Sequence, residues 1–338
     1  MAKMAELRAA FGASHTPMLN SPAEDIPKHA AIDRTGRALF DNEGRPTSYD
    51  VLARARRAAL ANEIAPDALR ARVARCQAGA DRLAAAIRAA DLDILIVVGD
   101  DQREQFVDDN MPAISIYWGD DIPNTVLDLP ENAPDFWKLA RSQYHEPSGT
   151  RRYPVAADLA RHLIESLMAQ DFDVSVSKEL RFARGEGHAF GFVHRRLMPE
   201  RAIPIVPVAL NTYYPPNQPH PGRCYRLGQA IRHAVEGWTR DAAVGIIASG
   251  GLSHFVVDET LDRAVLNACR DHDGATLSAL PPERLQSGNS EIRNWIVAAG
   301  AAETLAFAWS DYIACYRSLA GTGTGIAFAA WGGRTDIG

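Results

Sequence analysis

The sequence predicts an α/β protein with a central mixed sheet flanked by helices. Short apolar segments, typical of buried strands, alternate with segments whose apolar residues recur at three- and four-residue spacing, as in amphipathic helices. The most apolar strand candidates are residues 92–99 (LDILIVVG), 203–211 (IPIVPVALN) and 243–251 (AVGIIASGG). Strands and helices that alternate in this way usually form a sheet covered by its connecting helices.

The individual elements follow from local patterns in chain order. Residues 66–90 form the clearest helix candidate, because apolar residues repeat along one face at Leu69, Val73, Cys76, Ala80, Leu83 and Ile87. Further strands are expected near residues 7–13, 112–118 and 172–180, and further helices at 154–170, 224–238, 259–272 and 289–307. We expect residues 1–338 to form a single domain with a helical or irregular insertion at about residues 24–90.

The composition excludes several classes of protein. The net charge is -6 and the charges are mixed along the chain, so nothing indicates nucleic acid as a partner. No apolar stretch reaches the roughly 18 residues of a membrane span, and the N-terminus is too polar for a signal peptide. The cysteines form no CxxC pair, which favours a reduced, cytoplasmic location. They are Cys76, Cys224, Cys269 and Cys315.

Histidines and carboxylates follow the ends of several predicted strands. In α/β folds the chemistry usually lies at the carboxyl ends of the strands, so these side chains are candidates for one cleft. They are His15; Asp100, Asp101, Gln102 and Glu104; His188 and His194; and His254, Asp258 and Glu259. Histidine with carboxylate suits a non-heme iron or zinc site, and it also suits metal-free acid–base chemistry. A single such histidine is more often structural, but several strand ends together favour a functional site.

The order of the motifs resembles that of the class III extradiol ring-cleavage dioxygenases, the superfamily of the protocatechuate 4,5-dioxygenase β subunit. The segments that carry this resemblance are SHTP, GHAFGF, PVALNTYYPP, ASGGLSHF and GNSEIRNWIVAAGA. The resemblance implies an α/β catalytic domain that opens a catechol or aminophenol ring with O2 at a non-heme Fe(II), and it suggests a homodimer or a larger homo-oligomer. It also implies that His15 and Glu259 are metal ligands and that His188 and His254 are catalytic.

One implied ligand is missing. The resemblance places the second iron-binding histidine after the strand ILIVV, where this chain has Asp101 or Gln102. Either the site holds iron through His15, Glu259 and one of these residues, or no catalytic metal binds. In the second case the same histidines would serve a metal-independent hydrolase or lyase acting on a phenolic or diketone substrate. A non-catalytic binding protein is a third interpretation.

Other residues have weaker assignments. Tyr213, Tyr214 and Asn217 follow a strand end and are expected to contact the substrate, although their proline-rich loop could be only a rigid connection. Adjacent buried aspartates need a positive partner, which would be a metal or an arginine such as Arg103, Arg195 or Arg196. Arg317 is expected to form a structural salt bridge, with a substrate carboxylate as the alternative partner.

Overall fold

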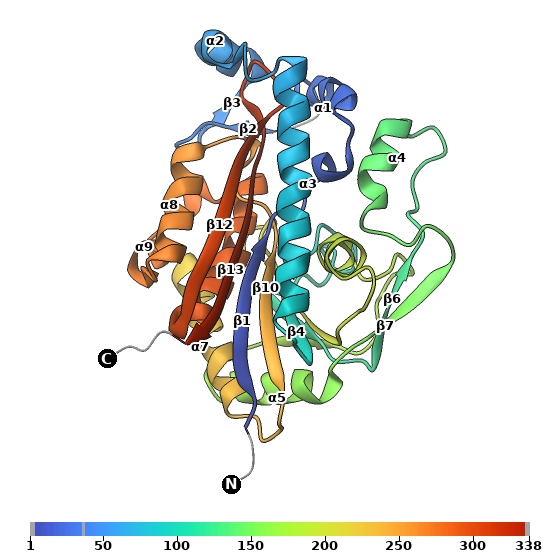
Figure 1. Ribbon diagram of the computed structural model, residues 1–338, viewed down its shortest axis with the longest axis vertical. Helices are drawn as coiled ribbons and strands as arrows, with labels where there is room; N and C mark the ends of the chain where they lie inside the picture. The colour runs from blue at the N-terminus through green and yellow to red at the C-terminus, as the bar shows by residue number, and fades with distance from the viewer. Residues whose placement is uncertain (1–3, 36–37, 335–338) are drawn as a thin grey trace.

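The computed structural model of the protein describes residues 4–35 and 38–334, and its centre is a mixed nine-stranded sheet (Figure 1). The strand order is β11-β13-β1-β10-β4-β9-β5-β8, and β12 pairs with β13 outside this path. The strands of this sheet are β1 (Glu6–Ala13), β4 (Ile94–Asp100), β5 (Ile114–Tyr117), β8 (Ser175–Ser177), β9 (Ile205–Leu210), β10 (Ala243–Ser249), β11 (His254–Val256), β12 (Leu305–Tyr316) and β13 (Thr322–Arg334).

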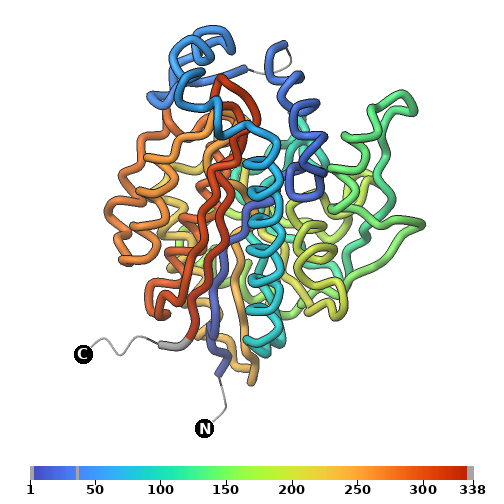
Figure 2. The backbone as a smooth tube through the Cα atoms, turned by 45° about the horizontal axis from the view of Figure 1, so that its top comes forward, coloured from blue at the N-terminus to red at the C-terminus, as the bar shows by residue number. Residues whose placement is uncertain are grey.

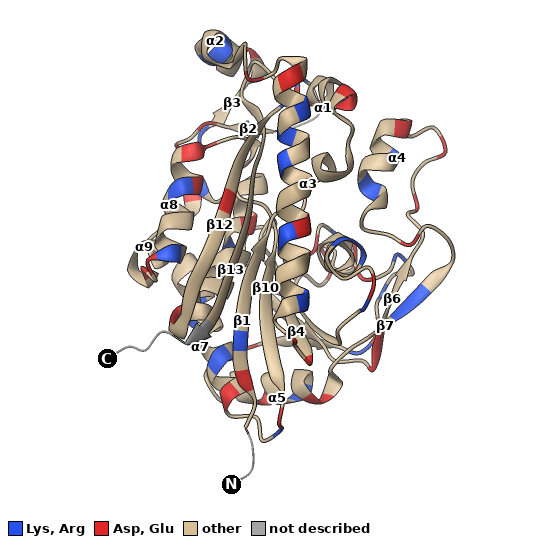
Figure 3. Ribbon diagram, in the orientation of Figure 1, with Lys and Arg blue, Asp and Glu red and all other residues tan. Residues whose placement is uncertain are grey.

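Strands β1, β10, β4 and β9 are parallel neighbours, whereas β13 and β5 run antiparallel to β1 and β9. Every residue of β4 and of β10 is buried, as expected for parallel strands that are covered on both faces. Charged residues colour helices, loops and also strands β1 and β12 in Figure 3, whereas the central strand β10 has none. The predicted fold class, α/β with a central mixed sheet flanked by helices, is confirmed.

Two helical layers cover the sheet. The helix α3 (Pro66–Ala89) packs against one face through Leu69, Ala80 and Leu83, within a core that includes Val97 and Ile247. The other face carries α5 (Ala157–Met168), α7 (Pro221–Glu236), α8 (Glu259–Arg270) and α10 (Ile292–Ala301). Among the described residues, no helix combines the length and the apolar character that a membrane span requires.

The remaining elements are short or lie around one end of the sheet. They are α1 (Ile26–Asp33), β2 (Leu39–Phe40), β3 (Pro46–Thr47), α2 (Tyr49–Leu60), β6 (Asp121–Thr125), α4 (Asp135–Ser142), β7 (Thr150–Pro154), α6 (His188–Phe192) and α9 (Gly274–Ser278). Figure 2 shows α1 and α2, in blue, gathered at the end of the sheet to which the parallel strands point. That β2, β3, α1 and α2 form an insertion into a single domain stays a prediction.

The C-terminal part of the chain differs from the sequence prediction. The expected helix at 289–307 is shorter, because α10 ends at Ala301 and Leu305 already begins β12. Strands β12 and β13 form a long antiparallel hairpin whose turn includes Gly321 at a positive φ of 74°. Glycine reaches this conformation without the steric cost of a side chain. The GTGTG run at 321–325 therefore forms the end of the hairpin turn and the start of β13.

A buried ion pair ties α1 to this hairpin. The Arg317 guanidinium donates to both carboxylate oxygens of Asp33, at 2.6 and 2.7 Å. The side chains are 7% and 0% exposed, so neither charge is solvated by water. The structure therefore supports the salt-bridge interpretation of Arg317.

We expect Asp33→Asn to lower the free energy of unfolding by about 3–5 kcal/mol, because the substitution leaves the buried Arg317 charge uncompensated. Urea denaturation at neutral pH measures the change. Asp311→Asn is the matched control, since Asp311 pairs with Arg75 at the surface and such pairs contribute at most about 1 kcal/mol. Equal, small losses in both variants would contradict this account of the ion pair.

Candidate metal and active site

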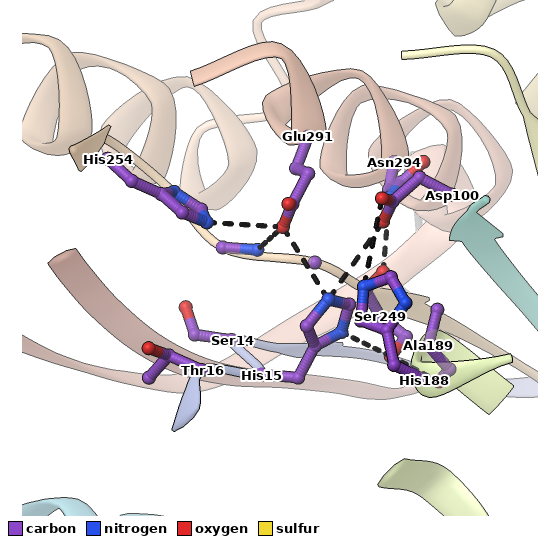
Figure 4. A network of polar contacts seen from close by, with 12 residues as sticks. Ser14, His15, Thr16, Asp100, His188, Ala189, Ser249, His254, Glu291 and Asn294 are labelled. Atoms are coloured by element: carbon purple, nitrogen blue, oxygen red, sulfur yellow. Dashed lines mark hydrogen bonds and ion pairs between the residues drawn. The ribbon is translucent and has the colours of Figure 1, made fainter. Parts of the chain in front are cut away.

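A cluster of buried polar side chains lies where three parallel strands end (Figure 4). His15 follows β1, Asp100 is the last residue of β4, and Ser249 is the last residue of β10. Glu291 reaches the same place from the turn that precedes α10. Because the carboxyl ends of parallel strands share one edge of the sheet, residues far apart in sequence meet here.

The hydrogen bonds of His15 fix its tautomer. The Ser249 hydroxyl donates its hydrogen to the Ala189 carbonyl at 2.7 Å, so its oxygen must accept from His15 Nδ1–H at 3.0 Å. His15 Nε2 then carries a lone pair, and this buried atom has no hydrogen-bond partner among the described residues. Burial, with the charge of His188, lowers the pKa of His15 to about 3, which keeps the ring neutral. A neutral imidazole with one nitrogen oriented by a hydrogen bond is the form that ligates a metal.

Two carboxylates face this free nitrogen. His15 Nε2 lies 3.7 Å from Glu291 Oε2 and 3.9 Å from Asp100 Oδ1. Asp100 Oδ1 is also buried without a hydrogen-bond partner. Burial, followed by the charge of Glu291, raises the pKa of Asp100 to about 8. The pocket thus places two ligand atoms without hydrogen bonds, His15 Nε2 and Asp100 Oδ1, side by side, and a divalent cation bound between them would favour the ionised form of Asp100.

Glu291 is the anchored member of the cluster. Its carboxylate accepts from the Tyr213 hydroxyl at 2.7 Å and from the Gly251 backbone N–H at 2.6 Å. His254 Nε2 lies 3.4 Å from Glu291 Oε2. Although burial opposes ionisation, the charge of His254 and the hydrogen bonds from His254 and the Gly251 N–H hold the pKa of Glu291 well below its usual range. Glu291 is therefore an anion at neutral pH.

The side chains that follow β4 point in two directions, toward the cluster or into the adjacent turn. The Gln102 amide lies near Asp100 Oδ2 at 3.3 Å, His188 Nε2 at 3.4 Å and Glu291 Oε1 at 3.4 Å, so Gln102 faces the cluster. The Asp101 carboxylate instead accepts three backbone N–H groups, from residues 104 to 106. Asp101 stabilises the turn, and its expected alternative role as a metal ligand does not fit this position.

The expected arginine partners of the two aspartates pair elsewhere. Arg103 pairs with Asp108, and the other two arginines pair with Glu146 and Asp81. Asp101 is satisfied by backbone N–H groups, whereas Asp100 keeps an oxygen without a partner. A bound cation therefore accounts better than an arginine for the buried Asp100 oxygen that has no hydrogen-bond partner.

His188 and His254 lie at the cluster as predicted from the sequence. His188 Nδ1 lies 2.7 Å from Glu104 Oε2, and its Nε2 lies 3.8 Å from Asp100 Oδ2. Burial alone would lower the pKa of His188, but the charge of Glu104 and the hydrogen bond to it raise the pKa to about 9. His254 Nδ1 donates to the Leu252 carbonyl at 2.7 Å, which leaves Nε2 toward Glu291.

The Glu104–His188 pair predicts a pH dependence of stability. The pKa of Glu104 falls from 4.5 to about 2, although burial opposes this, because His188 is positively charged and donates to it. The Glu104 contribution is present above pH 4.5 and is lost as the pH falls through about 2. The His188 contribution is present below pH 6.5 and is lost as the pH rises through about 9.

Glu104→Gln is therefore expected to destabilise the metal-free protein most between pH 4.5 and 6.5, and progressively less toward pH 9. Urea denaturation of both proteins at pH 5.5 and pH 9 measures this difference. A loss of stability that is the same at the two pH values would contradict the assigned charges.

The glutamate expected from the sequence is corrected by the structure. Glu259 is the first residue of α8, and its carboxylate accepts from Arg263 at 3.0 Å and from the Tyr316 hydroxyl at 2.9 Å. The side chain is 39% exposed and does not line the cavity that contains His15. Glu291, and not Glu259, lies beside His15.

Of the three residues predicted to contact the substrate, only Tyr213 lines the cavity. Tyr213 lines the cavity, together with His15, Gln102 and His254. Tyr214 does not line it and instead stacks under Arg103, whose guanidinium carbon lies 4.7 Å from the ring centre. Asn217 donates to the Met111 carbonyl and accepts from Asn211, so it holds its own loop together. The expected substrate roles of Tyr214 and Asn217 therefore do not fit their positions.

Several residues of the site were not assigned from the sequence. Glu291 lies inside the SEIRNW segment, which the resemblance already singled out, so the signal was present and was assigned to the wrong glutamate. Asp100 and Glu104 were noted at a strand end without separate roles. Arg141 and Tyr144 lie outside the segments that carry the resemblance, yet both line the cavity.

Comparison with known proteins places these observations in a family. Residues 84–327 match the family model described as the catalytic LigB subunit of aromatic ring-opening dioxygenase. Gallate dioxygenase of Pseudomonas putida is 38% identical over 106 residues, which is 30% of this chain and 30% of that protein. The 2,3-dihydroxyphenylpropionate/2,3-dihydroxicinnamic acid 1,2-dioxygenase of Cupriavidus necator is 31% identical over 189 residues, 54% of this chain and 50% of that protein.

The chain thus spans half or less of the length of these curated relatives. The family model, in contrast, covers most of the chain, including the strand end at Asp100, His188 on α6, and Glu291 before α10. His15 lies outside the matched range, but the fold brings it to the same cluster. The chain belongs to the family of the catalytic LigB subunit of aromatic ring-opening dioxygenases.

Proposed function

We propose that this chain is an extradiol dioxygenase that opens the ring of a catechol or aminophenol, with Fe(II) held by His15, Asp100 and Glu291. The observation that carries the proposal is the bare, buried Nε2 of His15, which faces two carboxylates at 3.7 and 3.9 Å. The family membership supports the reaction class, and the names of the relatives support catecholic substrates.

These residues fit a divalent cation. A neutral imidazole with two carboxylates is a nitrogen and oxygen ligand set that suits Fe(II) or Mn(II). His15, Asp100 and His188 also form a group whose ligand atoms lie within 4.8 Å of one another. We favour Glu291 over His188 as the third ligand, because Glu291 is ionised whereas Glu104 keeps a proton on His188. The cation would bind the Asp100 oxygen that has no hydrogen-bond partner and would favour its ionised form.

When bound, the metal would lower the pKa of a catechol hydroxyl and provide the redox-active centre that the reaction with O2 requires. His188 would hold or move the substrate proton at Nε2, because Glu104 fixes its Nδ1. The pKa of His188 would fall from about 9 when a cation neutralises Asp100, which brings it into the range of acid–base catalysis. His254 would hydrogen-bond a substrate oxygen through Nε2, since Nδ1 is engaged by Leu252.

Other side chains would exclude water and orient the ring. Tyr213 lines the cavity and fixes the Glu291 carboxylate through its hydroxyl. Tyr144 is buried, and its hydroxyl has no hydrogen-bond partner among the described residues. The cavity therefore offers an aromatic wall beside the proposed ligands, which suits a planar substrate.

A metal-independent hydrolase or lyase is the second candidate. Gln102 occupies the position where the resemblance implies a metal-binding histidine, and its amide contacts Asp100, Glu291 and His188. The charged pair of His188 and Glu104 could move a proton without a metal. This candidate predicts turnover that survives chelation.

Oxygen consumption distinguishes the two candidates. Protein that is purified anaerobically and loaded with Fe(II) is mixed with a panel of catechols and aminophenols in an oxygen-electrode cell. The dioxygenase proposal expects one O2 consumed per substrate opened, with loss of activity in a chelator. Absence of O2 uptake with every member of the panel, together with chelator-resistant hydrolysis of a phenolic or diketone compound, would favour the second candidate.

We also propose assembly as a homo-oligomer and a location in the reduced cytoplasm. The first follows from the family resemblance. All four cysteines are free and buried, which supports the second.

A further inference from the structure

One cation of the cavity has no carboxylate partner. Arg141 on α4 lines the same cavity as His15, Gln102 and Glu291. Its buried Nε has no hydrogen-bond partner, and no ion pair joins its guanidinium to another residue of the described chain. Arg317 also lines this cavity, but Asp33 neutralises it through two hydrogen bonds.

The position of α4 is fixed relative to the proposed metal ligands. Asn20 donates to the Leu139 carbonyl at 2.6 Å, and Gln143 donates to the Thr16 carbonyl at 2.8 Å. Thr16 directly follows His15. The helix is therefore tied to the strand end that delivers His15, at the end of the sheet where Figure 1 shows α1 and α4.

The surroundings of Arg141 favour an external anion. Its charge acts on Glu104 and Tyr144, whose pKa values it lowers, but Glu104 already pairs with His188 at 2.7 Å. The Trp137 ring, 5.4 Å from the guanidinium carbon, gives only a cation–π contact. Leaving a guanidinium nitrogen buried without a partner is costly, so a ligand that supplies a carboxylate would stabilise this arrangement.

We propose that Arg141 binds the carboxylate of a carboxylated catechol and so sets the specificity of the site for anionic over uncharged ring substrates. A planar guanidinium matches a carboxylate through two parallel hydrogen bonds. The inference rests on the proposed function for the identity of the ring. In this proposal Arg141 binds the carboxylate substituent, whereas the metal ligands and His188 act at the ring hydroxyls.

The test is anaerobic calorimetry with Fe(II)-loaded protein, in which binding is measured without turnover. The probes are gallate, with its carboxylate on the ring, 2,3-dihydroxyphenylpropionate, with its carboxylate on a side chain, and uncharged 4-methylcatechol. The variants are Arg141→Gln, Arg141→Lys and Lys138→Gln. Lys138 is the matched control, because it lies on the same helix but pairs outward with Asp135 and the Glu131 carbonyl.

Arg141→Gln is expected to raise the Kd of at least one carboxylated probe by about 10- to 100-fold, as loss of a charge-assisted hydrogen-bonded pair does. It should leave the Kd of 4-methylcatechol unchanged. Arg141→Lys should restore part of the loss, because it keeps the charge without the planar geometry, and Lys138→Gln should change neither affinity. The carboxylated probe with the larger loss identifies whether the carboxylate lies on the ring or on a side chain.

Two results would overturn the inference: equal effects of Arg141→Gln on charged and uncharged probes, or no binding of any carboxylated probe to the unaltered protein. Failure of the proposed function has a different signature. If the carboxylated probes bind through Arg141 but no O2 is consumed, the Arg141 assignment is supported and the dioxygenase proposal is not.

Discussion

Replacement of Glu291 by Gln is expected to abolish retention of Fe(II) and to lower kcat for ring opening by at least about 10³-fold, since the metal contributes several kcal/mol to such reactions. Gln keeps the size of the side chain, but Gly251 and Tyr213 donate to different carboxylate oxygens, so the single carbonyl oxygen of Gln can accept from only one of them. What it removes is the negative charge beside His15 Nε2. The measurements are iron content after anaerobic gel filtration and O2 uptake.

Glu259→Gln is the matched control, because it is the same substitution at the other candidate glutamate. Glu259 contacts Arg263 and Tyr316 on the outside of the cavity, so iron content and kcat should stay unchanged. Thermal melting of both variants separates loss of metal from loss of fold. The opposite ranking, with Glu259→Gln inactive and Glu291→Gln active, would restore the assignment made from the sequence.

His188→Ala is expected to lower kcat by about 10²- to 10⁴-fold, the usual contribution of a general acid–base group, while Fe(II) binding persists. Binding persists because His15, Asp100 and Glu291 all remain. Retention of iron with loss of turnover is the result that distinguishes an acid–base residue from a ligand. Loss of iron in His188→Ala would instead favour His15, Asp100 and His188 as the metal set.

His194→Gln serves as the control for this variant. His194 is a buried histidine in the short π-helix, Val193–Leu197, that follows α6, where its ring stacks on Tyr153 and pairs with Glu186. It does not line the cavity that contains His188. We expect its replacement to lower the melting temperature without lowering kcat per folded protein. If neither replacement lowers turnover, the acid–base role of His188 is contradicted, whereas absence of any turnover in the unaltered protein would favour the non-catalytic interpretation.

The sheet could be predicted where burial is complete on both faces. Strands β4 and β10 are short apolar runs in which every residue is buried, and β9 is a short apolar run in which only Ala209 is partly exposed, as expected for parallel strands covered on both faces. Strands β12 and β13 were not predicted. The outer strand β12 mixes buried and half-exposed residues, so it lacks the clear alternation that predicts a strand. The alanine-rich segment before it favours a helix, so the predicted helix extended to residue 307, beyond the end of α10 at Ala301.

The site could be predicted in part, for a similar reason. His15, Tyr213 and His254 lie a few residues after the ends of β1, β9 and β10, so the strand ends identified them, whereas His188 lies in the GHAFGF segment that carries the resemblance. Side chains alternate across a strand end, and a shift of one residue reverses their direction, so the sequence could not decide among the residues after ILIVV.

In the structure, the side chains of residues 100–102 alternate in direction as expected at a strand end. Asp100 and Gln102 face the cluster, whereas Asp101 faces its own turn. Glu291 was missed because it comes from a turn before a helix, and only the fold of α10 against the sheet brings it to the strand ends.

The most direct test is an anaerobic Fe(II) titration of the unaltered protein, with bound metal measured after removal of free ions. We predict about one Fe(II) per chain, held by His15 Nε2 and the carboxylates of Asp100 and Glu291. Ring opening should occur only when this Fe(II) is bound. Absence of Fe(II) binding at any concentration would contradict the proposed metal site and leave a metal-free enzyme in a dioxygenase fold.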